Sequence, residues 1–144
     1  MAIRLRGESI PMSSAKLDLV RSIHAAHARG DFSSAAWADP AIEYVIADGP
    51  SPGRWSGTAG MAESFRHNLI GWKDFRIEAD EFRELDDERV LVLIRSSAYG
   101  RAGTLVVGQM RAEGALVYHV SDGKVTKLVC YWNRDAALAD LGLE

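Results

Sequence analysis

The spacing of apolar residues changes along the chain, from a helical period in the first half to a strand period in the second. The first stripe of apolar residues recurs at helical spacing, which predicts an amphipathic helix. Ser13 and Ser14 precede this stripe and can cap the helix, which continues to about Arg29. Gly30 is typical of a residue that ends a helix. A short second helix is predicted over 33–37.

The next segment mixes a strand, a loop and a helix. Apolar residues alternate over 41–47, which predicts a strand with one buried face. Glycine and proline then gather over 48–57, and this composition indicates a loop. A third helix is predicted over 58–72, where apolar residues return to helical spacing.

From Phe75 onward the apolar residues alternate, as in half-buried strands. Asp122 and Gly123 form a strong hairpin signal between the last two strands. A short helix is predicted over 135–141. The four predicted strands cover 75–85, 89–99, 105–120 and 125–133. The segment 105–120 is either one long strand or two pieces broken by a bulge at Gly108 or Gly114.

This order of elements predicts an α+β domain. Two helices, a strand and a third helix precede four meandering antiparallel strands, and a short C-terminal helix closes the chain. Helices gathered on one face of a strongly bent antiparallel sheet produce a cone-shaped interior. We expect residues 1–13 to form a flexible arm and residues 14–144 to form the cone domain, with a pocket inside it.

Composition narrows the classes of function. The chain has 144 residues, with 17 Lys and Arg against 20 Asp and Glu, so its formal net charge is −3. This mild acidity and the absence of basic clusters argue against nucleic-acid binding. The apolar runs are too short to span a membrane, and no apolar signal core follows the N-terminus. Cys130 is the single cysteine and cannot form an internal disulfide, so we expect a cytoplasmic protein.

Several segments, in this order, resemble landmarks of SnoaL-like proteins in the nuclear transport factor 2 (NTF2) superfamily. The segments are 28–32 (ARGDF), 39–44 (DPAIEY), 55–61 (WSGTAGM), and 121–125 (SDGKV) followed by 131–134 (YWNR). The superfamily includes ketosteroid isomerases, polyketide cyclases and limonene epoxide hydrolases. The resemblance implies the cone fold, but one fold hosts many activities.

The resemblance also allows two known mechanisms to be compared with this chain. Ketosteroid isomerases use a carboxylate base with a tyrosine and a carboxylic acid as oxyanion donors. The matching positions here hold Val45, Ile23 and approximately Leu116, which are all aliphatic. Asp48 supplies a base only if the alignment of the first strand shifts. Steroid-type isomerisation is therefore disfavoured.

Limonene epoxide hydrolases need two carboxylates around an arginine. Arg95 matches that arginine, whereas Ser97 and Cys130 stand where the resemblance places the acids. This mechanism is therefore also missing its proton donor and acceptor.

The remaining candidates for chemistry are His27, Arg95 and, tentatively, Asp48. His27 projects near the centre of the first helical stripe, which suits a general acid or base. The alternative is a core histidine bonded to a backbone carbonyl. Arg95 is in phase with Leu91 and Leu93, which places it inside the cone as an electrostatic stabiliser. The alternative is that Arg95 turns outward.

The other predicted pocket residues are aromatic or small. Tyr118 is expected to donate a hydrogen bond to the ligand. Cys130 is predicted to line the pocket, and the alternative is that it packs in the core as a small hydrophobic residue. Glu43 and Asp48 are the expected partners of Arg95. The predicted ligand-binding residues are Trp37, Glu43, Trp55, Tyr118, Cys130 and Trp132.

These residues support three hypotheses. The first is a cofactor-independent isomerase, cyclase or hydrolase that binds a small, mostly apolar molecule with a polar or anionic group near Arg95. The second is a non-catalytic carrier, and the third is a dimerising interaction domain. His24 and His27 have a spacing that suits a metal, but no companion ligands accompany them, so no metal or cofactor is expected.

A homodimer is expected through the convex face of the sheet. His119 and Tyr131 are predicted to face outward there, beside the apolar Val117 and Val129. Apolar side chains on an outer face favour an interface over exposure to solvent.

Overall fold

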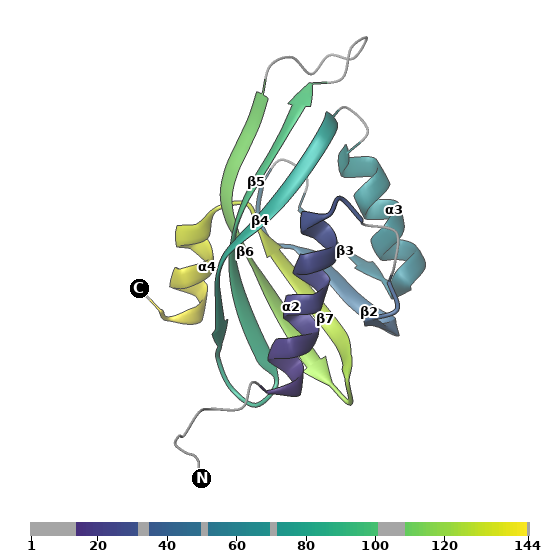
Figure 1. Cartoon of the computed structure of the whole chain (residues 1–144), viewed down its shortest axis with the longest axis vertical. Coiled ribbons are helices and arrows are strands. Elements are labelled where there is room, and N and C mark those ends of the chain that lie inside the picture. The colour runs from purple at the N-terminus through teal and green to yellow at the C-terminus, as the bar shows by residue number, and fades with distance from the viewer. Residues whose placement is uncertain (1–13, 32–34, 50–51, 70–71, 101–108, 144) are drawn as a thin grey trace.

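The computed structural model describes residues 14–31, 35–49, 52–69, 72–100 and 109–143. The predicted arm over 1–13 lies outside these residues. The described part contains three helices and one curved six-stranded sheet (Figure 1). No helix in this part of the chain is long and apolar enough to cross a membrane. The structure therefore confirms an α+β fold.

Helix α2 (Ala15–Ala28) is close to its predicted bounds. The Ser14 side chain accepts a hydrogen bond from the Leu17 backbone N–H at 3.1 Å, which caps the first turn. Gly30 follows the helix with a φ of 79°, a conformation that glycine adopts without steric cost.

The short helix predicted over 33–37 is not observed where the chain is described. Residues 32–34 lie outside the described part, and the chain turns before β2 (Ala38–Ile46) begins. The strand thus starts earlier than predicted and includes Pro40. Helix α3 (Gly57–Leu69) is confirmed but ends before Trp72, which belongs to the next strand.

The strands form one mixed sheet in the order β3-β2-β7-β6-β5-β4. Only β2 and β7 pair in parallel within this sheet of described strands. The long stretch of chain between them permits this direction, which a tight turn would not. β3 was predicted as loop, but it pairs antiparallel with β2. The other bounds are β3 (Gly53–Ser56), β4 (Trp72–Glu84), β5 (Arg89–Gly100), β6 (Gln109–Ser121) and β7 (Lys124–Tyr131).

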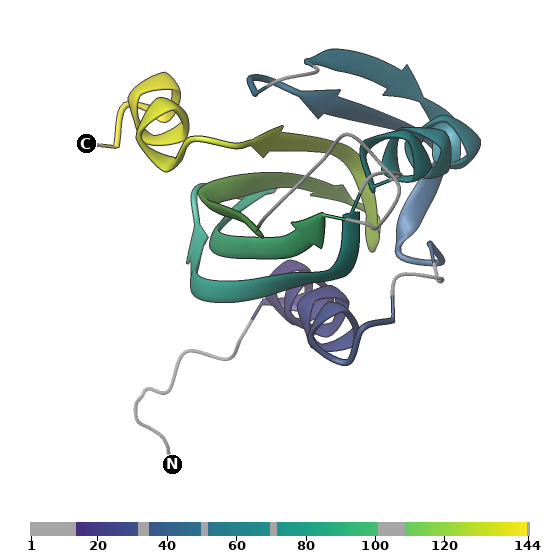
Figure 2. The ribbon, with the colours of Figure 1, turned by 90° about the horizontal axis from the view of Figure 1, so that it is seen from above.

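The sheet buries side chains on both faces. On the concave face, Val92 and Ile94 of β5 join a core that includes Val20 and Ile23 of α2. On the convex face, Leu91 of β5 packs in a separate cluster with α4 (Arg134–Leu141). Figure 2 shows α4 apart from α2 and α3 at the far end of β7. The sheet is therefore an apolar layer with α2 and α3 on its concave side and α4 on its convex side.

One arginine ties the strands together near the end of β7. The Arg134 guanidinium donates to the Asp80 carboxylate at 3.0 Å and to the Ile94 carbonyl at 2.8 Å. It also donates to the Gly114 carbonyl at 3.4 Å. Asp80 lies where the register of β4 against β5 shifts. Arg134 thus fixes the start of α4 to β4, β5 and β6.

Candidate functional site

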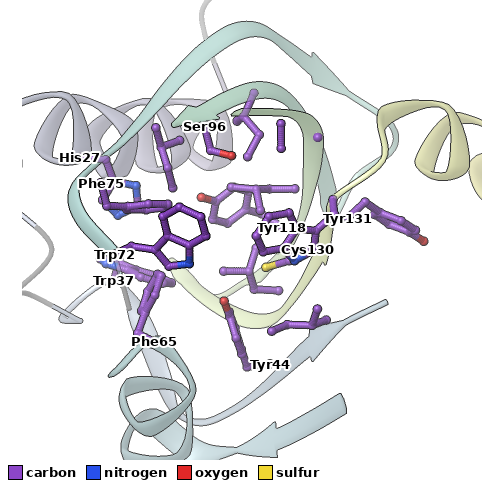
Figure 3. A pocket seen from close by; sticks show the side chains of 18 residues that line it. His27, Trp37, Tyr44, Phe65, Trp72, Phe75, Ser96, Tyr118, Cys130 and Tyr131 are labelled. Atoms are coloured by element: carbon purple, nitrogen blue, oxygen red, sulfur yellow. The ribbon is translucent and has the colours of Figure 1, made fainter. Parts of the chain in front are cut away.

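A pocket of about 110 Å³ lies on the concave side of the sheet. Its walls come from α2, α3 and the concave faces of the strands. Figure 3 shows aromatic side chains along one side, namely Trp37, Phe65, Trp72 and Phe75. Aromatic walls of this kind favour a flat, apolar ligand.

No described residue that lines this pocket is a lysine, arginine, aspartate or glutamate. The polar groups in the lining are those of His27, Tyr44, Ser96, Tyr118 and Cys130, together with the Trp132 indole and the outward-pointing Tyr131. A charged ligand would lose its hydration without gaining an opposite charge here. The electrostatics of the pocket therefore suit an uncharged molecule.

Tyr118 forms a buried hydrogen-bonded pair with His24. Its hydroxyl oxygen lies 2.8 Å from His24 Nε2, and the two residues are 0% and 5% exposed. Burial, reinforced by the nearby His27, lowers the pKa of His24 to about 3. Burial raises the pKa of Tyr118 well above its usual value. Both groups are therefore neutral at physiological pH.

Tyr44 and Cys130 form a second polar pair, between β2 and β7. A hydrogen bond joins the Tyr44 hydroxyl and the Cys130 sulfur, and burial raises the pKa of the thiol to about 12. In Figure 3 the Tyr44 hydroxyl points toward Cys130. A thiol with such a high pKa carries almost no thiolate at neutral pH, so Cys130 is not an activated nucleophile.

His27 lies at the edge of the pocket. It lines the interior pocket and also two surface grooves at the C-terminal half of α2. Burial lowers its pKa below the usual histidine value, and the Asp31 carboxylate opposes this shift. The structure thus places His27 beside the cavity, as the sequence predicted, with a neutral imidazole at neutral pH.

Arg95 does not line this pocket, so its predicted position inside the cone is wrong. Its guanidinium contacts Asp80 at 2.8 Å and Glu78 at 3.1 Å, and the side chain is 55% exposed. Arg95 is in phase with Leu91 and Leu93, as predicted, but that face is the convex one. The expected partners Glu43 and Asp48 are replaced by two carboxylates on the neighbouring strand.

Asp48, Glu43 and Trp55 also lie outside the pocket lining. Asp48 accepts hydrogen bonds from the backbone N–H groups of Trp132 and Asn133, at 2.6 and 3.2 Å. Its carboxylate therefore fixes the end of β7 and does not face the cavity as a base.

Glu43 forms ion pairs with Arg54 and Lys127 on the adjacent strands. The Trp55 ring packs on Tyr44, with ring centres 6.1 Å apart, and so supports the wall from behind. Neither residue lines the pocket where the sequence predicted it.

The predicted residues that do line the pocket are His27, Trp37, Tyr118, Cys130 and Trp132. Their contact with a ligand remains a prediction. His24 and Tyr44 belong to the site but were not predicted from the sequence. Tyr44 lies on the buried face of the first predicted strand, so its alternation with Ile42 and Ile46 was the available signal.

Part of the convex face is covered within the chain itself. Val117 is 2% exposed and packs with Val129 in the cluster under α4. The Tyr131 side chain points away from the pocket (Figure 3), and its hydroxyl donates to Asp140 of α4 at 3.0 Å. Helix α4 therefore covers these side chains of the predicted interface. The homodimer remains a prediction.

Comparison with known proteins identifies the fold. No protein-family model and no curated protein sequence matches this chain. Solved structures do match it. An NTF2-like protein of unknown function from Burkholderia pseudomallei superimposes with a TM-score of 0.71 at 20% identity, covering 88% of this chain and 97% of that one. The chain has an NTF2-like fold.

Two further solved structures share this fold. A putative SnoaL-like polyketide cyclase from a Jannaschia species has a TM-score of 0.69 at 10% identity, and the match covers 96% of this chain and 99% of that chain. TerC, co-crystallised with polyporic acid, has a TM-score of 0.69 at 21% identity, with 89% and 98% covered. The NTF2-like cone fold predicted from the sequence landmarks is thus confirmed.

Proposed function

We propose that this protein binds a compact, uncharged, mostly apolar organic molecule in the pocket on the concave side of its sheet. The observation that carries the proposal is a pocket lined by aromatic and aliphatic side chains, with no formally charged residue in its described lining. Similar structures include TerC with polyporic acid and a putative polyketide cyclase, which supports a small-molecule ligand.

The ligand we propose is neutral, which revises the expectation of an anionic group near Arg95. That guanidinium pairs with Asp80 and Glu78 outside the pocket and offers no charge to a ligand inside it. The volume of about 110 Å³ also limits ligand size. For comparison, a dry apolar cavity of about 150 Å³ holds benzene in another protein. The part of the ligand that the pocket encloses is therefore no larger than a single ring.

Binding of para-fluoroethylbenzene, followed by fluorine NMR, tests this proposal. We expect saturable binding to the wild type. Ala112 of β6 lines the pocket next to Ser96, its paired residue on β5. Larger side chains at position 112 should therefore fill the pocket. Ala112→Leu should weaken binding several-fold and Ala112→Phe should abolish it, because each larger side chain occupies pocket volume that the ligand needs.

Arg95→Ala is the matched control, since Arg95 lies on the other face of the same strands. We expect its affinity for para-fluoroethylbenzene to equal that of the wild type. Thermal melts check that each variant is folded. Absence of binding to the wild type, or equal binding to folded Ala112→Phe, would contradict a ligand site in this pocket.

A second candidate is proton-transfer catalysis by His27, consistent with a cofactor-independent isomerase or cyclase. The observation in its favour is an imidazole in the pocket wall whose lowered pKa keeps it neutral and able to accept a proton at neutral pH. The protein should accelerate deuterium exchange at the methyl group of para-fluoroacetophenone. His27→Gln should remove the acceleration, and a wild type that gives only the uncatalysed rate favours a carrier.

A further inference from the structure

The Tyr118–His24 pair contains more hydrogen-bonding capacity than it uses. A tyrosine hydroxyl can donate one hydrogen bond and accept others, and a neutral imidazole has one donor and one acceptor nitrogen. Within the described residues, Tyr118 forms only the bond to His24 Nε2, and His24 Nδ1 has no partner. Which of the two side chains donates decides what the Tyr118 hydroxyl offers to a ligand.

Two tautomers of His24 are available. A proton on Nδ1 would leave a buried N–H with no acceptor, which costs about 1–3 kcal/mol. A proton on Nε2 lets that nitrogen donate to the Tyr118 oxygen, so the donor left over is the Tyr118 O–H. Tyr118 lines the pocket, where a ligand can accept from it, whereas His24 lines none of the described pockets. The Phe82 ring, 5.6 Å from that of His24, helps to exclude water from this region. An acceptor bound in the pocket therefore favours the Nε2–H tautomer.

This tautomer leaves the Tyr118 O–H without an acceptor among the described residues. Tyr118 lines the pocket, and Figure 3 shows its hydroxyl pointing toward the side formed by His27 and Phe75. The other two phenols in the lining are already bonded, Tyr44 to Cys130 and Tyr131 to Asp140. Tyr118 is therefore the tyrosine in this pocket with a donor to offer.

We propose that the Tyr118 hydroxyl, held by His24, donates a hydrogen bond to a carbonyl oxygen of the ligand, so that the pocket selects uncharged cyclic or aromatic ketones. This inference rests on the proposed function and adds the ligand's functional group to it. The carbonyl supplies the missing acceptor, and the ring fills the aromatic part of the pocket. His24 acts as a positioning residue, since it contacts Tyr118 and not the ligand.

The test compares para-fluoroacetophenone with para-fluoroethylbenzene, which differ chiefly in the carbonyl oxygen. Fluorine NMR gives both dissociation constants. We expect the wild type to bind the ketone about threefold to tenfold more tightly, the range of one neutral hydrogen bond. Tyr118→Phe should bind the two compounds equally. Tyr99→Phe, which removes the hydroxyl of an exposed tyrosine, should keep the wild-type preference.

Two readouts isolate the role of His24. Nitrogen NMR of the imidazole in the para-fluoroacetophenone complex should show the proton on Nε2, and a proton on Nδ1 in that complex would overturn the proposal directly. His24→Leu should lose the preference for the ketone, whereas His24→Gln, whose amide can still donate to Tyr118, should retain part of it. Loss of preference in His24→Leu with an unchanged affinity for the hydrocarbon excludes a collapsed pocket.

The outcomes also separate this inference from the proposed function. Equal binding of both compounds by the wild type would refute the carbonyl contact while leaving the apolar pocket intact. Binding of neither compound would refute the proposed function and this inference with it.

Discussion

Replacement of Gly114 by alanine is expected to lower the free energy of unfolding by about 3 kcal/mol, the upper end of the usual cost of overpacking. A Cβ atom at this position would lie 2.3 Å from the Tyr131 carbonyl oxygen. That oxygen belongs to the backbone at the end of β7, so it cannot move as a flexible side chain would. Urea denaturation monitored by circular dichroism measures the change.

Gly30→Ala provides the matched control for this prediction. Gly30 has a φ of 79°, but no atom lies within 4 Å of an added Cβ. Its substitution should cost only the left-handed backbone penalty of about 1–2 kcal/mol. A Gly114→Ala variant no less stable than Gly30→Ala would show that β6 and β7 can separate at this point without loss.

The second large effect is a loss of stability in acid caused by His24. Its pKa is lowered to about 3 in the folded protein, whereas a histidine in the unfolded chain titrates near 6.5. Between these values the unfolded state binds the extra proton, so stability falls as the pH falls. The full effect of one such group is about 1.4 kcal/mol per pH unit within this window.

The difference between the wild type and His24→Phe isolates this contribution. His27 and His119 also have lowered pKa values and add to the acid sensitivity of both proteins. The variant should be less stable at neutral pH, because Tyr118 loses its partner, but its stability should fall less steeply below pH 6.5. The exposed His67→Gln variant should keep the wild-type slope. Equal slopes in wild type and His24→Phe would refute the burial of a neutral imidazole.

Local signals in the sequence identified most elements because each depends on neighbouring residues. Ser14 caps α2 where the sequence placed the cap. Asp122 and Gly123 have φ values of 52° and 76°, which fit the two-residue hairpin turn that this pair predicted. The β3 strand was missed because its four residues have a loop-like composition and gain their structure from pairing with β2.

The site was harder to predict, since it depends on which face of an element meets the cavity. The alternation correctly placed Arg95 on the same face of β5 as Leu91 and Leu93. Because both faces of β5 are apolar, the alternation could not show that this face packs against α4 rather than lining the pocket. In α2, His24 and His27 are one turn apart, and the direction in which the helix packs decided that His24 is the more buried.

The sequence by itself determined α2, α3, α4 and the C-terminal hairpin strands, because caps, turns and apolar period are properties of adjacent residues. The tertiary structure decided which polar groups meet. It brought His24 to Tyr118 across 94 positions and placed Arg95 among carboxylates outside the pocket. The curvature of the sheet assigns each strand face to the cavity or to α4, and that curvature arises only when all the strands have paired.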